Sequence, residues 1–328
     1  MIDYRSFINT DPPRLAELWT KCAAARAHFQ RVTPELLDDL VFSKQYFDRK
    51  GLIVATEDSV PVGFVHAAFG PSKDFSTISS DVGVICALLV DDSHRGQGVG
   101  RSLLALAQQF LLERGAKLIY GGGARPFNPF YWGLYGGAEF PGVLASEPAA
   151  QGLFQSAGFE VFGRTVLWRC DLDQFKPPMN RQQLQVKRQF DVRAIADPQP
   201  ATWWEANTAE ALEQVRYELV CKTTRDVKAS VTLWTMERKT EGMLIRSAGV
   251  MDLLVDEDLR RQGAGTFLVG DALRELKLRN FATVEGQTFR QDEGIGKLLS
   301  NLGFQEVDQG TIFRKVVNDA TTMPLASS

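Results

Sequence analysis

The sequence predicts an α/β (α+β) fold of two similar units, each a mixed, mostly antiparallel sheet flanked by helices. Strand-like and helix-like segments alternate along its 328 residues, a length that suits two domains better than one. The stretch VDDSHRGQGVG at residues 90–100 recurs as VDEDLRRQGAG at residues 255–265. The two copies are 165 positions apart (255 − 90 = 165), about half the chain, so we infer a tandem duplication.

The first unit begins with two predicted helices and a hairpin. Prolines together with Asp or Thr mark helix starts in 11–29 and in 33–42. β-branched and aromatic runs at 51–58 and 61–70 predict an antiparallel hairpin, because only two residues separate them. The continuous apolar run 81–90 then predicts a strand that is buried on both faces.

The recurring stretch joins this buried strand to a predicted helix. Residues 101–115 place apolar side chains at helical spacing and end at Gly115, a typical C-terminal stop. A short strand at 116–123 and a hairpin at 157–172 follow, and the whole unit reads β-α-α-β-β-β-α-β-α-β-β.

A polar segment separates the two units. Residues 172–185 carry a pair of prolines and lack apolar periodicity, which is typical of a linker. We therefore expect an N-terminal domain at 1–173, a linker at 174–184 and a C-terminal domain at 185–328.

The second unit repeats the element order of the first in a shorter form. We expect a first strand at 184–195, a helical region at 200–215 and a central strand at 242–255. The remaining predicted elements are a hairpin of 217–224 and 227–237, a helix at 265–280, a strand at 282–289, and a helix with a final hairpin at 292–316.

Charge and composition favour a small partner. A net charge of −3 and the lack of a long basic run argue against nucleic acid or a membrane surface as the main partner. No apolar run approaches the length of a membrane span, and the N-terminus does not resemble a secretory signal. The four cysteines and three histidines form no metal-binding pattern. We therefore expect a cytoplasmic protein with reduced thiols and without a metal.

The recurring stretch has the features of an anion-binding loop. Its glycines remove Cβ atoms, so that backbone N–H groups can approach an anion at the positive end of the following helix. The loop lacks the Gly-Lys-Ser/Thr end of a Walker A sequence, and Leu103 stands where a dinucleotide fold requires a third glycine. A pyrophosphate is the natural ligand, although a tight strand-to-helix turn without a ligand fits the same residues.

The first unit carries about 20 more residues than the second between the loop and its last hairpin. This extra segment, residues 124–144, is rich in aromatic residues, glycine and proline. A disordered insertion would be polar and poor in aromatics. We expect either an ordered wall of an acceptor pocket or a plug between the two units.

Residues 88–104 and 253–269 resemble the acyl-CoA-binding segment of GNAT-type N-acetyltransferases, in which a strand ends in Val and Gln/Arg-x-x-Gly-x-Gly/Ala opens a helix. The order of the surrounding elements is also similar, down to the Gly-Phe pair that starts each last hairpin. The resemblance covers nearly the whole chain as two tandem copies, an architecture similar to mycothiol synthase-like double-domain acyltransferases.

This resemblance implies acetyl-CoA as the cosubstrate. Backbone groups of Leu88, Leu89 and Val90 would face its pantetheine arm, and Arg95, Gly96, Gln97, Gly98, Val99 and Gly100 would hold its pyrophosphate. In the second copy the corresponding residues are Leu253, Val255, Arg260, Arg261, Gln262, Gly263, Ala264 and Gly265.

The catalytic residues are less well defined. Many family members have a Tyr four residues before the glycine of the Gly-Phe pair as a proton donor, but this chain has Phe154 and Leu299 there. A CoA thiolate is a good leaving group, so transfer can proceed without a side-chain acid. Other candidates for an acid or base are Tyr131, Tyr135, Glu139 and Glu147 in the first unit and Asp252 in the second.

The resemblance implies acetyl transfer to an amine of a small molecule or peptide by direct attack in a ternary complex. We expect the first unit to be catalytic and the second to bind CoA or to serve as a scaffold, in a monomer with an internal pseudo-dimer. The alternative is a CoA-binding or acyl-CoA-sensing protein without catalysis, which the missing Tyr in both copies favours.

Overall fold

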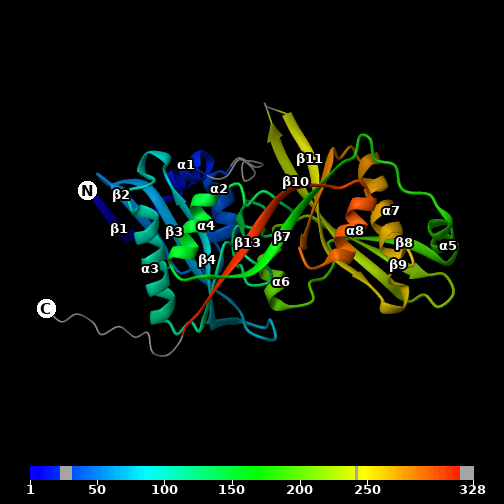
Figure 1. The fold of residues 1–328 in the computed structure, drawn as a ribbon, viewed down its shortest axis with the longest axis horizontal. Coiled ribbons are helices and arrows are strands. Elements are labelled where there is room, and N and C mark those ends of the chain that lie inside the picture. The colour runs from blue at the N-terminus through cyan, green and yellow to red at the C-terminus, as the bar shows by residue number, and fades with distance from the viewer. Residues whose placement is uncertain (23–31, 241–242, 318–328) are drawn as a thin grey trace.

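Backbone hydrogen bonds join the strands of both units into one sheet (Figure 1). The computed structural model describes residues 1–22, 32–240 and 243–317. The strand order is β1-β2-β3-β4-β5-β13-β7-β12-β11-β10-β9-β8, and the short strand β6 also pairs with β13. Neighbouring strands run antiparallel except for β4 with β5 and β11 with β12. The predicted mixed, mostly antiparallel sheet is therefore confirmed.

The first half follows the predicted order of elements except for its last hairpin. Its helices and strands are β1 Ile2–Ser6, α1 Pro12–Cys22, α2 Pro34–Leu37, η2 Asp38–Phe42, β2 Leu52–Glu57, β3 Val60–Pro71, β4 Ile78–Val90, η3 Asp92–His94, α3 Val99–Glu113, β5 Leu118–Gly121, β6 Val143–Leu144, α4 Pro148–Ser156 and β7 Glu160–Asp171. The helix predicted at 11–29 is α1 as far as Cys22, and residues 23–29 lie outside the described residues. The helix predicted at 33–42 is one α-helical turn, α2, followed by the π-helical η2.

The second half contains the remaining elements. They are α5 Arg181–Gln189, β8 Phe190–Ala196, α6 Trp203–Thr208, β9 Gln214–Cys221, β10 Val227–Thr240, β11 Met243–Val255, η4 Glu257–Leu259, α7 Ala264–Leu278, β12 Thr283–Phe289, α8 Glu293–Asn301 and β13 Gln305–Val316. The helical region predicted at 200–215 is only the short α6.

The prediction of a strand at 184–195 was wrong in its first part. Residues 181–189 form the helix α5, and β8 begins only at Phe190. Asn180 caps this helix, because its side-chain oxygen accepts a hydrogen bond from the Gln183 backbone N–H at 3.0 Å. The last residues of the predicted linker 174–184 are therefore helical.

The two predicted C-terminal hairpins were also wrong. Residues 160–171 form one long strand, β7, and residues 305–316 form another, β13. These two strands pair with each other, and β13 also pairs with β5 while β7 also pairs with β12. Each half thus supplies a strand to the other half of the sheet, and in Figure 1 β7 and β13 run side by side across the centre. The predicted linker 174–184 therefore separates the two halves in the sequence, but the sheet continues across both halves.

The predicted core positions of α3 pack on the sheet. Leu103, Leu104, Ala107 and Leu111 are at most 1% exposed and belong to one apolar cluster with β2, β3 and β4 residues. The apolar run of β4 is buried from Gly83 to Ala87, as its composition predicts. The corresponding helix α7 covers the second half of the sheet with Leu268, Ala272 and Leu273.

The extra segment 124–144 packs between the two halves. Trp132 and Phe140 form a buried cluster with Trp234 and Met251 from β10 and β11. The Trp234 indole N–H donates a hydrogen bond to the Ala138 carbonyl oxygen at 2.9 Å. The sequence allowed either a wall of an acceptor pocket or a plug between the two units, and this packing corresponds to the plug.

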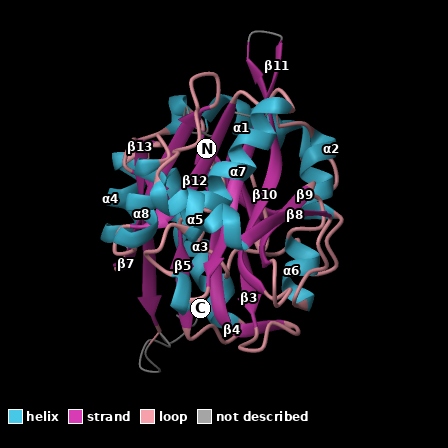
Figure 2. Cartoon of the chain, turned by 90° about the vertical axis from the view of Figure 1, so that its right-hand side faces the viewer, coloured by secondary structure: helices cyan, strands magenta, loops and turns pink. Residues whose placement is uncertain are grey.

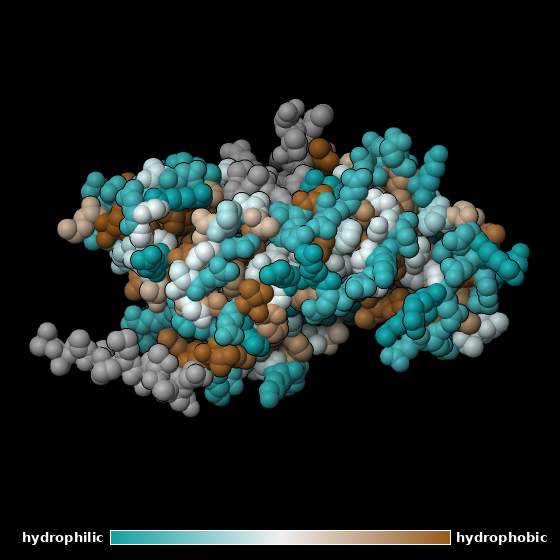
Figure 3. Space-filling view, viewed as in Figure 1, coloured by the Kyte–Doolittle hydropathy of each residue, from teal (hydrophilic) through white to brown (hydrophobic). Residues whose placement is uncertain are grey.

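Helices lie on the outside of the sheet, and Figure 2 shows α5 beside α7 on the side of the second half. Polar residues cover most of the face drawn in Figure 3, where apolar residues form scattered patches. No helix among the described residues is both long and apolar enough to cross a membrane.

Gly310 offers a test of the central crossing. It lies in β13 opposite Thr165 of β7 and Leu144 of β6, and a Cβ there would lie 1.8 Å from the Pro141 carbonyl oxygen. We expect Gly310→Ala to lower the free energy of unfolding by roughly 2 kcal/mol or more, because overpacking costs this much. Urea unfolding measures the change.

The matched control is Gly152→Ala in α4, where a Cβ would meet no atom within 4 Å. This variant should gain about 0.5–1 kcal/mol, because alanine favours a helix over glycine. Equal stability of the two variants would contradict the close approach of β13 to residues 141–144.

Candidate functional site

The loop after β4 forms an open nest at the N-terminus of α3. Asp91 starts the turn η3, and its Oδ1 accepts a hydrogen bond from the Ser93 backbone N–H at 3.0 Å. Gly96 and Gly98 follow with φ of +76° and +87°, a left-handed conformation that glycine adopts without steric cost. A Cβ built on either glycine would meet no atom within 4 Å. The loop therefore leaves room for a ligand against the free N–H groups of the helix.

Arg95 fastens this loop to β4 and to α1. Its Nε donates to the Val90 carbonyl oxygen at 3.2 Å, and its Nη2 donates to the Cys22 carbonyl oxygen at 3.0 Å. The guanidinium also forms an ion pair with Asp92 at 3.0 Å. The side chain remains 52% exposed, so its positive charge lies at the mouth of the nest.

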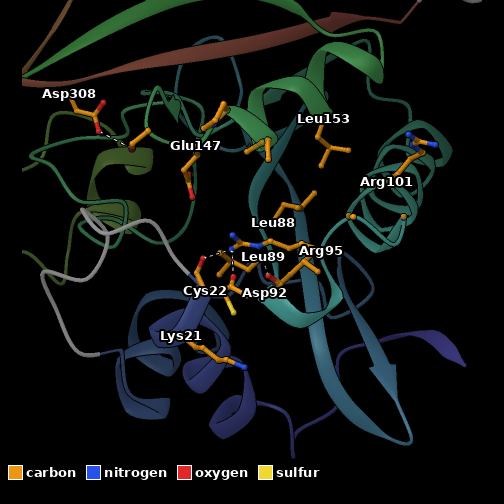
Figure 4. Close-up of a pocket in the computed structure, with 18 of the residues that line it drawn as sticks. Lys21, Cys22, Leu88, Leu89, Asp92, Arg95, Arg101, Glu147, Leu153 and Asp308 are labelled. Atoms are coloured by element: carbon orange, nitrogen blue, oxygen red, sulfur yellow. Dashed lines mark hydrogen bonds and ion pairs between the residues drawn. The ribbon is translucent and has the colours of Figure 1, made fainter.

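A cleft of about 700 Å³ opens beside the nest (Figure 4). In Figure 4, Glu147 points into the cleft from the wall that faces Arg95. The cleft is lined by Lys21, Cys22, Leu88, Leu89, Val90, Asp92, Arg95, Gly96, Gly98, Gly100, Arg101, Ser146, Glu147, Pro148, Ala149, Ala150, Leu153, Val307 and Asp308. It therefore lies between β4 and α3 on one side and α4 and β13 on the other.

Seven of the predicted first-loop residues line this cleft, and two do not. Gln97 is exposed, and its amide N–H donates to the Ser93 carbonyl oxygen at 2.9 Å. The Val99 side chain is 2% exposed and packs in the core beneath α3. Both stabilise the turn, and a ligand would meet only their backbone.

Apart from Glu147, the sequence did not indicate the opposite wall of the cleft. Val307 and Asp308 come from β13, which the sequence assigned to a hairpin of the other unit. The Ser146 hydroxyl donates to Asp308 at 3.2 Å and connects α4 to this strand. Lys21 and Cys22 belong to the last described turn of α1, inside the helix predicted at 11–29, and no signal in the sequence singled them out.

Glu147 is the one predicted acid or base that lines the cleft. It occupies the N-cap position of α4, but its side chain makes no capping hydrogen bond and points into the cleft. Burial raises the pKa of this carboxyl group, Arg95 opposes the rise and Asp308 adds to it. Its carboxyl group can therefore exchange a proton closer to neutral pH than an exposed glutamate.

Tyr131 and Tyr135 lie in the core instead of the cleft. The Tyr131 hydroxyl is 2.8 Å from His66 Nδ1, and Tyr131 is 1% exposed. The Tyr135 hydroxyl donates to the Cys86 carbonyl oxygen of β4. Burial raises the pKa of both phenols well above the usual value, so both keep their protons. Their contacts indicate packing.

Glu139 and Asp252 share one arginine at the junction of the two halves. Arg125 Nη1 is 3.3 Å from Glu139, and Arg125 Nη2 is 2.8 Å from Asp252 of β11. Burial raises the pKa of Glu139 to about 7, partly opposed by Arg125, and the charge of Asp252 adds to the rise. Neither carboxylate lines the cleft, and their contacts join residues 124–144 to the second half.

The positions of the missing Tyr are filled by core residues. Phe154 is 4% exposed and its ring packs against Phe159 and Phe313. Leu299 is 1% exposed in the core of the second half. These side chains stabilise α4 and α8 and offer no proton.

The second loop repeats the internal hydrogen bonds of the first. Arg260 Nε donates to the Val255 carbonyl oxygen at 3.1 Å, and Gln262 donates to the Asp258 carbonyl oxygen. Each donor and acceptor lies 165 positions after its counterpart in the first loop (260 − 95 = 165). Gly263 has a φ of +87°, and Arg261 takes the place of Gly96 with a φ of +60°.

The helix α5 covers the second nest. Gln183 is 3% exposed, and its Nε2 donates to the Gly263 carbonyl oxygen at 3.4 Å. A Cβ on Gly263 would lie 2.9 Å from that Nε2 and 3.4 Å from the Gln182 Cβ. Among the other predicted residues of this copy, Leu253 lies on β11, and Ala264 and Gly265 begin α7. The space that is open in the first loop is filled by protein in the second.

The described residues contain no group of three His, Cys, Asp or Glu side chains that could hold a metal ion. Cys22, Cys86, Cys170 and Cys221 are free thiols, and the first three are buried.

Residues 14–136 match the family model described as the Acetyltransferase (GNAT) family. Among the curated proteins, none matches the sequence significantly. These matched residues include β4, the open nest and α3.

Solved structures resemble the whole chain. A GCN5-related glucosamine N-acetyltransferase region of a fungal multi-domain GH3 β-N-acetylglucosaminidase is 18% identical, with 96% of this chain and 38% of that chain covered and a TM-score of 0.67. A tandem GNAT protein from the clavulanic acid biosynthesis pathway is 17% identical, with 98% and 100% covered and a TM-score of 0.65. A GCN5-related N-acetyltransferase from Sphaerobacter thermophilus is 14% identical, with 96% and 95% covered and a TM-score of 0.65. The predicted fold of two tandem GNAT-like units is confirmed.

Glu139 should make stability depend on pH. Because its pKa is raised to about 7 in the folded chain, the folded state keeps a proton that the unfolded chain loses above about pH 4.5. The contribution of this proton to the free energy of unfolding is complete below pH 4.5 and is lost as the pH rises through 7. Glu139→Gln should therefore gain stability relative to the wild type across this window, by at most about 3 kcal/mol. Urea unfolding at pH 5 and pH 8 measures the difference, and a constant difference would show that Glu139 does not titrate there.

Proposed function

Because residues 14–136 match the family model of the Acetyltransferase (GNAT) family, we propose that this protein transfers an acetyl group from acetyl-CoA to an amine of a small molecule or peptide. The observation that supports this proposal best is the open nest of Gly96 and Gly98 at the N-terminus of α3. It adjoins a cleft of about 700 Å³, which is large enough for a cofactor-sized ligand.

In this proposal, the backbone N–H groups of residues 96–100 hold the pyrophosphate, and Arg95 supplies a positive charge beside it. Leu88, Leu89 and Val90 line the cleft at the end of β4, where their backbone can pair with the pantetheine amides. Leu153 and Ala150 of α4 supply the apolar opposite wall. The absence of a Cβ at both glycines is the feature that fits a large anion.

The acyl thioester brings an activated carbonyl group, so the chain has to align an amine with it and remove a proton. We assign proton removal to Glu147, because its carboxyl group points into the cleft and its pKa is raised. Tyr131, Tyr135 and Glu139 make their contacts outside the cleft, so we do not assign proton removal to them. No side-chain acid is assigned to the departing thiol.

We assign the transfer to the N-terminal unit, 1–173, and a scaffold role to the C-terminal unit, 185–328. The contact of Gln183 with Gly263 supports this division of roles, because it fills the second nest. The four free thiols support a cytoplasmic location. We propose a monomer, because the chain contains its own pseudo-dimer.

The second candidate function is binding or sensing of acyl-CoA without transfer. Phe154 and Leu299 favour it, because neither can donate a proton to the departing thiol. Incubation with acetyl-CoA and a broad panel of small amines and peptides separates the two functions. Release of free thiol that depends on the amine supports transfer, whereas tight binding without release across the panel supports the sensor.

A matched pair of loop variants tests which nest binds acetyl-CoA. Gly98 and Gly263 share a φ of +87°, so a Trp at either position carries a similar backbone strain. Gly98→Trp should weaken binding at least tenfold, because its ring would fill the open nest. Gly263→Trp should keep the affinity and lose more stability, because its Cβ collides with Gln183.

Isothermal titration with acetyl-CoA measures the affinities, and thermal unfolding measures the stabilities. Full binding by Gly98→Trp together with lost binding by Gly263→Trp would show that the second unit is the active one.

Glu147→Gln tests the assigned base. The rate of transfer in the wild type should rise with pH as Glu147 loses its proton, and the variant should lose this rise. The value of kcat should fall about 10²-fold, the lower end of the usual effect of a general base. The exposed Glu113→Gln on α3 is the control and should keep both kcat and the pH profile. An unchanged pH profile in Glu147→Gln would exclude Glu147 as the base.

A further inference from the structure

The strand β4 carries one extra residue just before the residues that line the cleft. Neighbouring residues of β3, His66 and Ala67, pair with Ala87 and Ile85 of β4. Cys86 is the extra residue, because it lies opposite neither of them. The pairing of β4 with β5 ends at Ile85, one residue earlier. An extra residue in one strand of an antiparallel pair is a β-bulge, which redirects the side chains around it.

This bulge decides which side chains of β4 face α3. Successive side chains of a strand alternate between the two faces of the sheet. Cys86 and Ala87 break this alternation, because both belong to the apolar cluster on the α1 side. Leu88 and Val90 therefore pack on the α3 side, and a Cβ on Gly100 would lie 3.9 Å from Leu88 and 3.7 Å from Val90. Without the extra residue these two side chains would turn to the α1 side and leave the start of α3.

Tyr135 of the extra segment 124–144 holds the bulge. Its hydroxyl donates a hydrogen bond to the Cys86 carbonyl oxygen. Its ring is held from two sides, because its centre lies 5.9 Å from the Trp19 ring of α1 and 5.6 Å from the Phe140 ring. The extra segment thus contacts the one residue of β4 that lies outside the regular pairing with β3.

The second half has the corresponding bulge in β11. Asp252 and Leu253 together oppose the single residue Val231 of β10. Asp252 lies 165 positions after Ala87 (252 − 87 = 165) and has a left-handed φ of +52°. The extra segment contacts this bulge too, because Arg125 Nη2 is 2.8 Å from the Asp252 carboxylate. One segment therefore contacts the bulges of both central strands, and of the two only the bulge in β4 adjoins an open nest.

We propose that Tyr135 is a positioning residue for the transfer assigned to the first unit, an inference that rests on the proposed function. By holding the Cys86 carbonyl group, its hydroxyl fixes the bulge and keeps Leu88 and Val90 turned towards the start of α3. The end of β4 then presents a bound thioester to the amine in one fixed position. Tyr135 acts through β4 and takes no part in proton transfer.

Tyr135→Phe tests the proposal, because it removes the hydroxyl and keeps the ring between Trp19 and Phe140. In amine-dependent release of thiol, kcat should fall at least tenfold, since a displacement of about 1 Å can cost 10²-fold in rate. KM for acetyl-CoA and its affinity should stay within about threefold, because Arg95 and not Tyr135 fastens the pyrophosphate loop. 4-Aminophenylalanine at position 135 keeps a donor and should restore kcat.

Hydrogen exchange of the full-length protein without acetyl-CoA tests the bulge directly. The backbone amides of residues 86–89 should exchange at least tenfold faster in Tyr135→Phe than in the wild type. Those of residues 247–250, which pair with β12, should keep their rates. The matched control is Tyr46→Phe, which also loses a phenol donor, here to the Asn207 carbonyl oxygen of α6 at 3.2 Å. It should keep both kcat and the exchange of residues 86–89.

Unchanged exchange of residues 86–89 in Tyr135→Phe would overturn the proposal. An unchanged kcat, or an equal fall of kcat in Tyr46→Phe, would also overturn it. 4-Fluorophenylalanine, which fills the space of the hydroxyl without a donor, takes the place of phenylalanine if Tyr135→Phe does not fold. If the wild type releases no thiol with any amine, the proposed transfer fails, and the exchange rates still decide whether Tyr135 fixes the bulge.

Discussion

The pairing of β7 with β13 is the constraint on which the rest of the structure depends. Each strand belongs by sequence to one half and pairs on its other side with a strand of the opposite half. Backbone hydrogen bonds within a sheet are satisfied only while both strands are present. The cleft beside Gly98 also depends on this pairing, because Val307 and Asp308 of β13 form part of its wall. The cleft beside Gly98 therefore depends on both halves of the chain.

Ion pairs reinforce the same junction. Arg169 of β7 contacts Glu285 of β12 at 2.6 Å, and Glu285 is 2% exposed. Arg125 connects residues 124–144 to Asp252 of β11. Glu285 is the buried member of these pairs, and breaking a buried ion pair costs about 3–5 kcal/mol. The halves are held by specific polar contacts as well as by the sheet.

The sequence predicted what is local and missed what depends on distant partners. The apolar run of β4, the glycines of the nest and the spacing of α3 are short-range signals, and the structure has all three. The residues of 157–172 favour extended chain, but they predict a hairpin where the structure has the single strand β7, and no pattern within a strand states which strand lies beside it. The predicted strand 184–195 is helical as far as Gln189, because Asn180 caps the helix α5 and the polar run Lys187, Arg188 and Gln189 interrupts the alternation that a strand would need. The closure of the second nest by Gln183 followed from that helix and could not be foreseen without it.

The exchange of strands also sets the order in which the protein can be completed as it is made. β5 ends at Gly121, and its neighbour β13 ends at Val316, 195 residues later (316 − 121 = 195). At the usual rate of translation, roughly 10–40 s separate the synthesis of these two strands. During that interval one edge of β5 has no partner and the cleft lacks a wall. The nascent chain therefore contains the glycine loop after β4 early in synthesis. The cleft beside this loop is complete only after β13 has left the ribosome.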